Sequence, residues 1–191
     1  MLEWLKQLDY SLFLLINGAH NHFFDFVMIW ISSIKLWIPL YILLIYLTII
    51  KHKKKAWFAI PIFILSIGLS DLASVHLFKN VFERLRPCYE PELAGLVNNI
   101  VGCGGQFGFV SSHASNSFVI AFMAIFLLGS KYKWINWLMP FWAIIIIYSR
   151  VYLGKHYPSD VIVGALLGIL ISWIMFQVFK SISLYFSSKD I

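Results

Sequence analysis

The stretch AWFAIPIFILSIGLSDLASVHLF, residues 56–78, decides the fold class because it is apolar over a length that spans a lipid bilayer. Its only ionisable side chains are Asp71 and His76. Four further runs share this character, so the expected spans are Phe24–Ile50, Ala56–Phe78, His113–Gly129, Trp134–Val151 and Asp160–Phe179. Backbone groups in lipid must bond within their own segment. The sequence therefore predicts an all-α, polytopic membrane helical bundle of about five transmembrane helices.

The composition also indicates a membrane protein. Hydrophobic residues make up 60% of the 191 residues and charged residues only 13%, with a mean hydropathy of +0.80. Soluble domains carry about 45–50% apolar and about 25% charged residues. The length suits a single membrane-embedded domain over residues 1–191. The net charge of +6 does not indicate a nucleic acid partner, because Lys51, Lys53, Lys54 and Lys55 cluster as at a cytoplasmic membrane flank.

Residues 1–20 carry a shorter, amphipathic pattern. The apolar residues that recur at helical spacing are Leu2, Leu5, Leu8 and Leu12. Charged side chains interrupt them and no small-residue cleavage site follows, so no secretory signal peptide is expected. The pattern predicts an interfacial amphipathic helix that lies on the membrane surface. The alternative is a short buried helix packed against the bundle.

Basic residues set the expected orientation. They follow the first, third and fifth spans, as Lys51 to Lys55, Lys131 and Lys133, and Lys180 and Lys189. The positive-inside rule places these groups and the C-terminus in the cytoplasm. The N-terminus, residues 79–112 and residues 150–159 are then extracytoplasmic.

Five cations fall in the outer segments against this rule, namely Lys79, Arg84, Arg86, Arg150 and Lys155. Binding of an anion is the simplest reason for cations on that side, and Arg can grip phosphate oxygens with paired donors. Residues 79–112 are therefore the expected extracytoplasmic active-site loop. His113 and Asp160 begin the third and fifth spans, where free N–H groups and the helix dipole also favour an anion.

Two histidines on this face point to phosphoryl transfer. Asp160 would repel a phosphate unless a partner occupies it, and His156, four residues earlier, is that partner. An Asp bonded to one imidazole nitrogen fixes the tautomer and leaves the other nitrogen free to attack phosphorus. His113 can then protonate the departing oxygen. Singly, such residues more often lie at the headgroup level or snorkel, so the complete set carries the prediction.

The same segments resemble the type 2 phosphatidic acid phosphatase superfamily, which includes bacterial lipid phosphatases and vanadium haloperoxidases. Its signature is Lys-x6-Arg-Pro, then Pro-Ser-Gly-His, then Ser-Arg-x5-His-x3-Asp. Lys79–Pro87 matches the first motif and Ser149–Asp160 matches the third. The second motif keeps its Ser and His but has Val110 for Pro and Ser112 for Gly.

The resemblance implies a metal-independent lipid phosphatase that needs no cofactor. His156 would form a phosphohistidine, Asp160 would orient it, and His113 would protonate the leaving group and then activate water. The implied phosphate ligands are Lys79, Arg86, Ser111, Ser112 and Arg150. These cations would take the charge-stabilising role that Mg²⁺ often plays.

The resemblance also bears on substrate and location. An acyl or prenyl chain can stay in lipid while its headgroup enters a site at the bilayer edge. Undecaprenyl diphosphate is the expected substrate, with phosphatidylglycerol phosphate and lipid A phosphates as alternatives. The expected location is a bacterial cytoplasmic (inner) membrane, with the site facing the periplasm. Rival classes are a non-enzymatic transporter or channel subunit, with ionisable groups lining the midplane, and a haloperoxidase-like enzyme, whose relatives are soluble.

The outer loop contains both cysteines of the chain. A disulfide between Cys88 and Cys103 would enclose about 15 residues and contribute about 3 kcal/mol in the chain-entropy model. Two free thiols are the alternative. The nearby glycines predict a loop that turns sharply or approaches the headgroup, and they are Gly102, Gly104, Gly105 and Gly108.

The remaining ionisable residues have structural interpretations. Asp71 lies about 12 Å below Lys79 at about 1.5 Å per residue, so we expect it to form a hydrogen bond with a neighbouring helix rather than to touch the phosphate. His76 matches no motif. His20 and His22 are expected in an interfacial loop.

Overall fold

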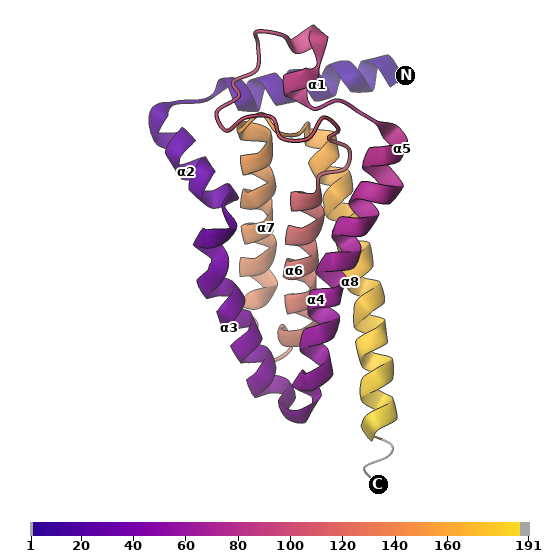
Figure 1. Ribbon diagram of the computed structural model, residues 1–191. Coiled ribbons are helices and arrows are strands. Elements are labelled where there is room, and N and C mark those ends of the chain that lie inside the picture. The colour runs from indigo at the N-terminus through magenta and orange to yellow at the C-terminus, as the bar shows by residue number, and fades with distance from the viewer. Residues whose placement is uncertain (1, 188–191) are drawn as a thin grey trace.

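The computed structural model describes residues 2–187, and helices account for nearly all of them. Lys189, one of the lysines used to predict the orientation, lies outside these residues. The helices are α1 (Leu2–Gly18), α2 (His22–Ser32), α3 (Ile34–His52), α4 (Ala56–Ala73), a π-helical segment (Ser74–Lys79), α5 (Asn80–Phe82), α6 (Ser112–Leu128), α7 (Ile135–Tyr152) and α8 (Pro158–Ser187) (Figure 1). No strand occurs among the described residues, so the all-α prediction is confirmed.

Several helices are long and apolar enough to cross a membrane. By length and hydropathy, the described residues contain three such continuous stretches, Ile34–Phe82, Ile135–Tyr152 and Pro158–Phe186. The first reverses at Lys53, where φ is +49°, so α3 and α4 run antiparallel from the Lys53–Lys55 turn (Figure 1). The apolar helix α6 has 17 residues and lies among the others. The chain is therefore a multi-pass membrane protein.

The first expected span is not one helix. The sequence predicts Phe24–Ile50 as continuous, but α2 ends at Ser32, Ser33 is extended at φ −84° and ψ 129°, and α3 starts at Ile34. Tertiary contacts satisfy the groups that this break frees. The Trp37 indole donates to the Ile31 carbonyl at 2.8 Å, and Arg150 of α7 donates to the Ser32 hydroxyl.

Helix α1 lies across one end of the bundle and is bent by 112° from α2 (Figure 1). Tyr10 and Phe13 are buried, and their rings contact the buried Tyr157 with centroids 5.1 and 5.6 Å apart. The opposite face exposes Trp4 and Leu15. The structure therefore shows α1 packed against the bundle, which was one of the two alternatives for this segment. Because its other face is apolar and exposed, a position at the membrane surface stays a prediction.

The basic turn lies at the opposite end from α1. Lys51 donates to the Leu127 carbonyl at 2.7 Å, which places the Lys53–Lys55 turn beside the end of α6. Lys131 follows directly in the next loop. Lys51 to Lys55 and Lys131 therefore gather at one end of the bundle, and the segments expected outside gather at the other (Figure 1).

Two glycines of α8 allow it to approach α6 closely. A Cβ atom on Gly164 would lie 2.7 Å from the Ser111 carbonyl oxygen, and one on Gly168 would lie 2.3 Å from the Ser115 carbonyl oxygen. Small residues are common where membrane helices pack backbone to backbone. The Ser111 N–H consequently donates to the Asp160 carbonyl at 3.1 Å. This packing places the start of α6 beside the start of α8.

Candidate active site

The three motif segments meet at the α1 end of the bundle. Lys79 ends the π-helical segment, Arg86 follows in the loop, His113 lies in the first turn of α6, and Arg150 lies in the last turn of α7. His156 lies in the short connection from α7 to α8. All five side chains line one cavity, as the sequence predicts for a single site.

His156 is held between a carboxylate and a guanidinium. Its side chain is almost fully buried, with Nδ1 3.5 Å from Oδ2 of Asp160 and Nε2 3.5 Å from Nη1 of Arg86. One ring nitrogen thus faces the carboxylate and the other faces the cationic cavity. Burial and the neighbouring cations, Arg86 first, hold the pKa of His156 well below its ordinary value. The imidazole is therefore neutral at pH 7 and keeps a lone pair for attack.

Asp160 is fully buried and firmly held. Its Oδ2 accepts from the Tyr157 backbone N–H at 3.0 Å, and its Oδ1 accepts from Nη1 of Arg84 at 2.8 Å. Buried carboxylates need such partners because an unpaired charge inside a protein is costly. The hydrogen bonds fix the carboxylate that orients His156.

Arg84 connects this carboxylate to α1. Its Nη2 donates to Oδ2 of Asp9 at 2.6 Å, and its guanidinium carbon lies 4.1 Å from the centre of the Tyr157 ring. Asp9 also accepts from the Ser159 backbone N–H at 2.9 Å. The sequence does not indicate this network, because it groups Arg84 with the cations expected to bind an anion, and Asp9 lies 75 residues away.

The two serines of the second motif, Ser111 and Ser112, make different contacts. The Ser112 hydroxyl accepts from Nζ of Lys79 at 2.7 Å and lines the cavity. The Ser111 hydroxyl instead caps α6 by accepting from the Ala114 N–H at 3.3 Å, and its side chain is fully buried. Ser111 therefore supports the helix start beneath the cavity, whose free N–H groups remain suited to an anion.

Gly108, one of the four loop glycines that the sequence singles out, lies against the catalytic pair. A Cβ atom there would lie 3.1 Å from Oδ2 of Asp160 and 3.2 Å from Cγ of Arg86. The glycine-rich loop was expected to approach the lipid headgroup. Gly108 approaches the His156–Asp160 pair, so a larger residue would displace one of these side chains.

The loop that carries Arg86 and Gly108 is anchored at two points. The structure joins Cys88 to Cys103, with Cα atoms 6.0 Å apart, within the range of natural disulfides. Nζ of Lys155 donates to the carbonyls of Val101 and Gly102. Of the five cations that break the positive-inside rule, Arg84 and Lys155 therefore have structural partners, and the other three line the cavity.

Loss of the Cys88–Cys103 bridge is expected to lower stability more than it alters chemistry. A Cys88→Ser/Cys103→Ser variant should unfold with a free energy lower by about 3 kcal/mol, because the unfolded loop is no longer constrained. Thermal unfolding in detergent, with and without reductant, measures this difference. If both thiols of the purified, unreduced protein react with an alkylating reagent, as mass mapping would reveal, the bridge does not exist.

Comparison with known proteins identifies the family. The PAP2 superfamily matches residues 59–183. The lipid A 4'-phosphatase of Bacteroides thetaiotaomicron is 34% identical over 179 residues, which cover 92% of this chain and 79% of the relative. The lipid A 4'-phosphatase of Porphyromonas gingivalis is 30% identical over 181 residues, covering 93% and 75%.

A solved structure has the same arrangement of helices. The crystal structure of Aquifex aeolicus LpxE superimposes with a TM-score of 0.65 at 28% identity, covering 89% of this chain and 95% of the other. The two relatives that align over more than nine tenths of this chain at 30% identity or more are named phosphatases, which favours an enzyme over a transporter or channel subunit. From its family match and these relatives, this chain belongs to the PAP2 superfamily and is a lipid phosphatase of the membrane.

Proposed function

We propose that this protein removes a phosphate monoester from a lipid through a phosphohistidine on His156, without a metal ion. The observation that carries the proposal is the orientation of His156, whose Nδ1 faces Asp160 and whose Nε2 faces the cationic cavity. A neutral imidazole held in this way is a nucleophile aimed at a bound phosphate.

The reaction has two steps. Nε2 of His156 attacks phosphorus, an N–P bond forms, and the bond from phosphorus to the lipid oxygen breaks as that oxygen takes a proton from His113. His113 then removes a proton from water, the water oxygen attacks phosphorus, and the N–P bond breaks to release inorganic phosphate. Lys79, Arg86 and Arg150 stabilise the negative charge on the phosphoryl oxygens in both steps.

The substrate we favour is the 4'-phosphate of lipid A or a similar phosphorylated glycolipid. Two relatives at 30% identity or more, each aligned over more than nine tenths of this chain, are named lipid A 4'-phosphatases. Undecaprenyl diphosphate, which the sequence suggested from the frequency of that activity in the family, is the second candidate. Phosphatidylglycerol phosphate is the third.

We also propose that the site faces the periplasm from a bacterial inner membrane. Lys51 to Lys55 lie at the opposite end of the bundle from the site, and the positive-inside rule assigns that end to the cytoplasm. Labelling of single cysteines introduced near Lys53 or Glu92, with a reagent that does not cross membranes, tests this orientation in intact cells. Labelling at Lys53 alone would invert it.

A phosphate-release panel tests the function. Purified protein in detergent is expected to act on lipid A with a kcat/KM at least about tenfold above that for undecaprenyl diphosphate, phosphatidylglycerol phosphate or phosphatidic acid, since one well-placed polar contact is worth that much. EDTA is expected to leave the rate unchanged. A preference for undecaprenyl diphosphate would transfer the assignment to the second candidate, and EDTA inactivation that Mg²⁺ reverses would refute the metal-free scheme.

A further inference from the structure

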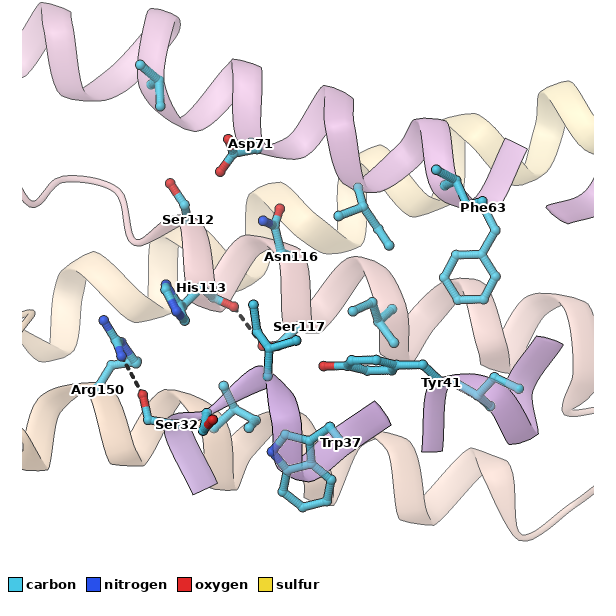
Figure 2. Close-up of a pocket in the computed structure, with 18 of the residues that line it drawn as sticks. Ser32, Trp37, Tyr41, Phe63, Asp71, Ser112, His113, Asn116, Ser117 and Arg150 are labelled. Atoms are coloured by element: carbon cyan, nitrogen blue, oxygen red, sulfur yellow. Dashed lines mark hydrogen bonds between the residues drawn. The ribbon is translucent and has the colours of Figure 1, made fainter. Parts of the chain in front are cut away.

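A cavity of about 710 Å³ extends from the cationic site along the inside of the bundle between α3, α4, α6 and α7 (Figure 2). Its wall changes along α4 and the π-helical segment that continues it, which together contribute Lys79, Asp71 and Phe63 at intervals of eight residues, or about 12 Å. The cavity wall is cationic at Lys79 and apolar at Phe63. Between them is a middle band, which consists of Asp71, Asn116 and Ser117.

Asp71 is an unused acceptor in this band. The sequence predicts a structural hydrogen bond to a neighbouring helix, but among residues 2–187 no side chain or backbone group donates to its carboxylate. Figure 2 shows the carboxylate on the cavity wall, on the same side as Ser112 and Asn116. Among the described residues, Lys79 attracts this carboxylate electrostatically without bonding to it. The carboxylate is therefore available to a ligand.

Asn116 adds a second unused acceptor. It lies one helical turn beyond Ser112 on α6, and its Oδ1 is buried with no hydrogen-bond partner among the described residues. Its neighbour Ser117 differs, because that hydroxyl donates to the His113 carbonyl of its own helix at 2.6 Å. Buried polar atoms of folded proteins nearly always have a partner, so an orphan on a cavity wall indicates a place for a ligand donor.

We propose that Asp71 and Asn116 bind hydroxyl or amide donors on the leaving group, so that the preferred substrate is a phosphate monoester of a sugar that carries acyl chains. This inference rests on the proposed function and deepens it. Two acceptors close to the phosphate match sugar hydroxyls and acylamide N–H groups. The apolar level beyond them matches hydrocarbon.

The same band opposes a diphosphate. In a prenyl diphosphate the second phosphate follows the reacting one directly, and it would lie where the Asp71 carboxylate and the Asn116 oxygen face the cavity. The negative charges of that phosphate and of the Asp71 carboxylate would repel each other, and neither acceptor can donate to phosphate oxygens through these atoms. The band therefore selects a neutral, donor-rich leaving group.

Two substitutions test the subsite in the full-length protein. The measured quantity is the ratio of kcat/KM for lipid A to kcat/KM for farnesyl diphosphate in mixed micelles. Asp71→Asn and Asn116→Ala are each expected to lower this ratio about tenfold or more, the usual effect of losing a hydrogen bond to a charged or buried partner. Asp71→Asn should also raise the rate on the diphosphate, because it removes the repelling charge.

Ser117→Ala is the matched control, since its hydroxyl lines the same band but already bonds to its own helix. It is expected to leave the ratio unchanged. If the wild-type protein prefers lipid A and neither test variant moves the ratio, or each loses equally on both substrates, the subsite proposal is refuted and the proposed function stands. If the wild-type protein releases phosphate from the diphosphate but not from lipid A, the subsite proposal and the lipid A assignment are both refuted, and the substrate assignment passes to the second candidate.

Discussion

The His156→Ala variant is expected to lose at least about ten-thousandfold in phosphate release, because removal of the nucleophile abolishes the covalent route rather than weakening it. His156 is the residue whose ring nitrogen faces the cationic cavity, and its opposite nitrogen faces Asp160 at 3.5 Å. No other described imidazole shares this carboxylate. Initial rates on lipid A in detergent, at equal protein concentration, measure the loss.

His22→Ala is the control for the loss of a histidine, since His22 begins α2 and lies away from the cavity. It should retain the wild-type rate. Both variants should elute and unfold as the wild-type protein does. Rapid acid-free quenching and mass spectrometry should detect a phosphoryl group on His156 in the wild-type protein during turnover. Undiminished activity of His156→Ala would exclude the covalent mechanism proposed for this residue.

The sequence predicts a helix of the bundle correctly where the residues of that helix alone require it to be a membrane span. The run Ala56–Phe78 is apolar enough to require a spanning helix, and α4 with its π-helical extension occupies it. The break at Ser33 could not be predicted in this way. Beside the break, the Ile31 carbonyl accepts from the nearby Trp37 indole, and the Ser32 hydroxyl accepts from Arg150 of α7, a donor 118 residues away that only the folded bundle brings there.

The residues of the candidate site likewise divide into those that the sequence predicts and those that only the folded structure reveals. Motif spacing and topology together place Lys79, His113 and His156 at one cavity. Each motif is a short stretch of sequence, and the number of spans between the motifs determines at which end of the bundle each one lies. The support for Asp160 is not local. Arg84 is 75 residues from Asp9 and 76 from Asp160, so neither pairing has a signal in spacing or periodicity. Orphan acceptors on a cavity wall are likewise visible only in three dimensions.

The Arg84→Ala variant is expected to have the second largest effect, a fall in kcat of about a hundredfold with little change in KM. Arg84 touches no reacting atom and acts as a positioning residue through Asp160, whose carboxylate also accepts from the Tyr157 backbone N–H. Outer partners that orient a catalytic group are typically worth about 10–100-fold, and the uncompensated burial of Asp160 adds to this loss. Steady-state kinetics on lipid A separate kcat from KM.

A merely structural role for Arg84 would give a different pattern. Lys6→Ala, which breaks the exposed ion pair from α1 to Glu92, is the control for loosening α1 and should leave kcat unchanged. Arg84→Lys should recover part of the lost kcat, because an ammonium can still neutralise Asp160 but lacks the planar guanidinium whose two ends reach Asp160 and Asp9 separately. If Arg84→Ala melts earlier yet keeps its kcat, or if Lys6→Ala lowers kcat as much, Arg84 only fastens α1 to the bundle. A selective fall in kcat that Arg84→Lys partly restores would show that α1 contributes to catalysis. It would do so through Asp9, which bonds to Arg84 and lies outside residues 59–183, the region that matches the family.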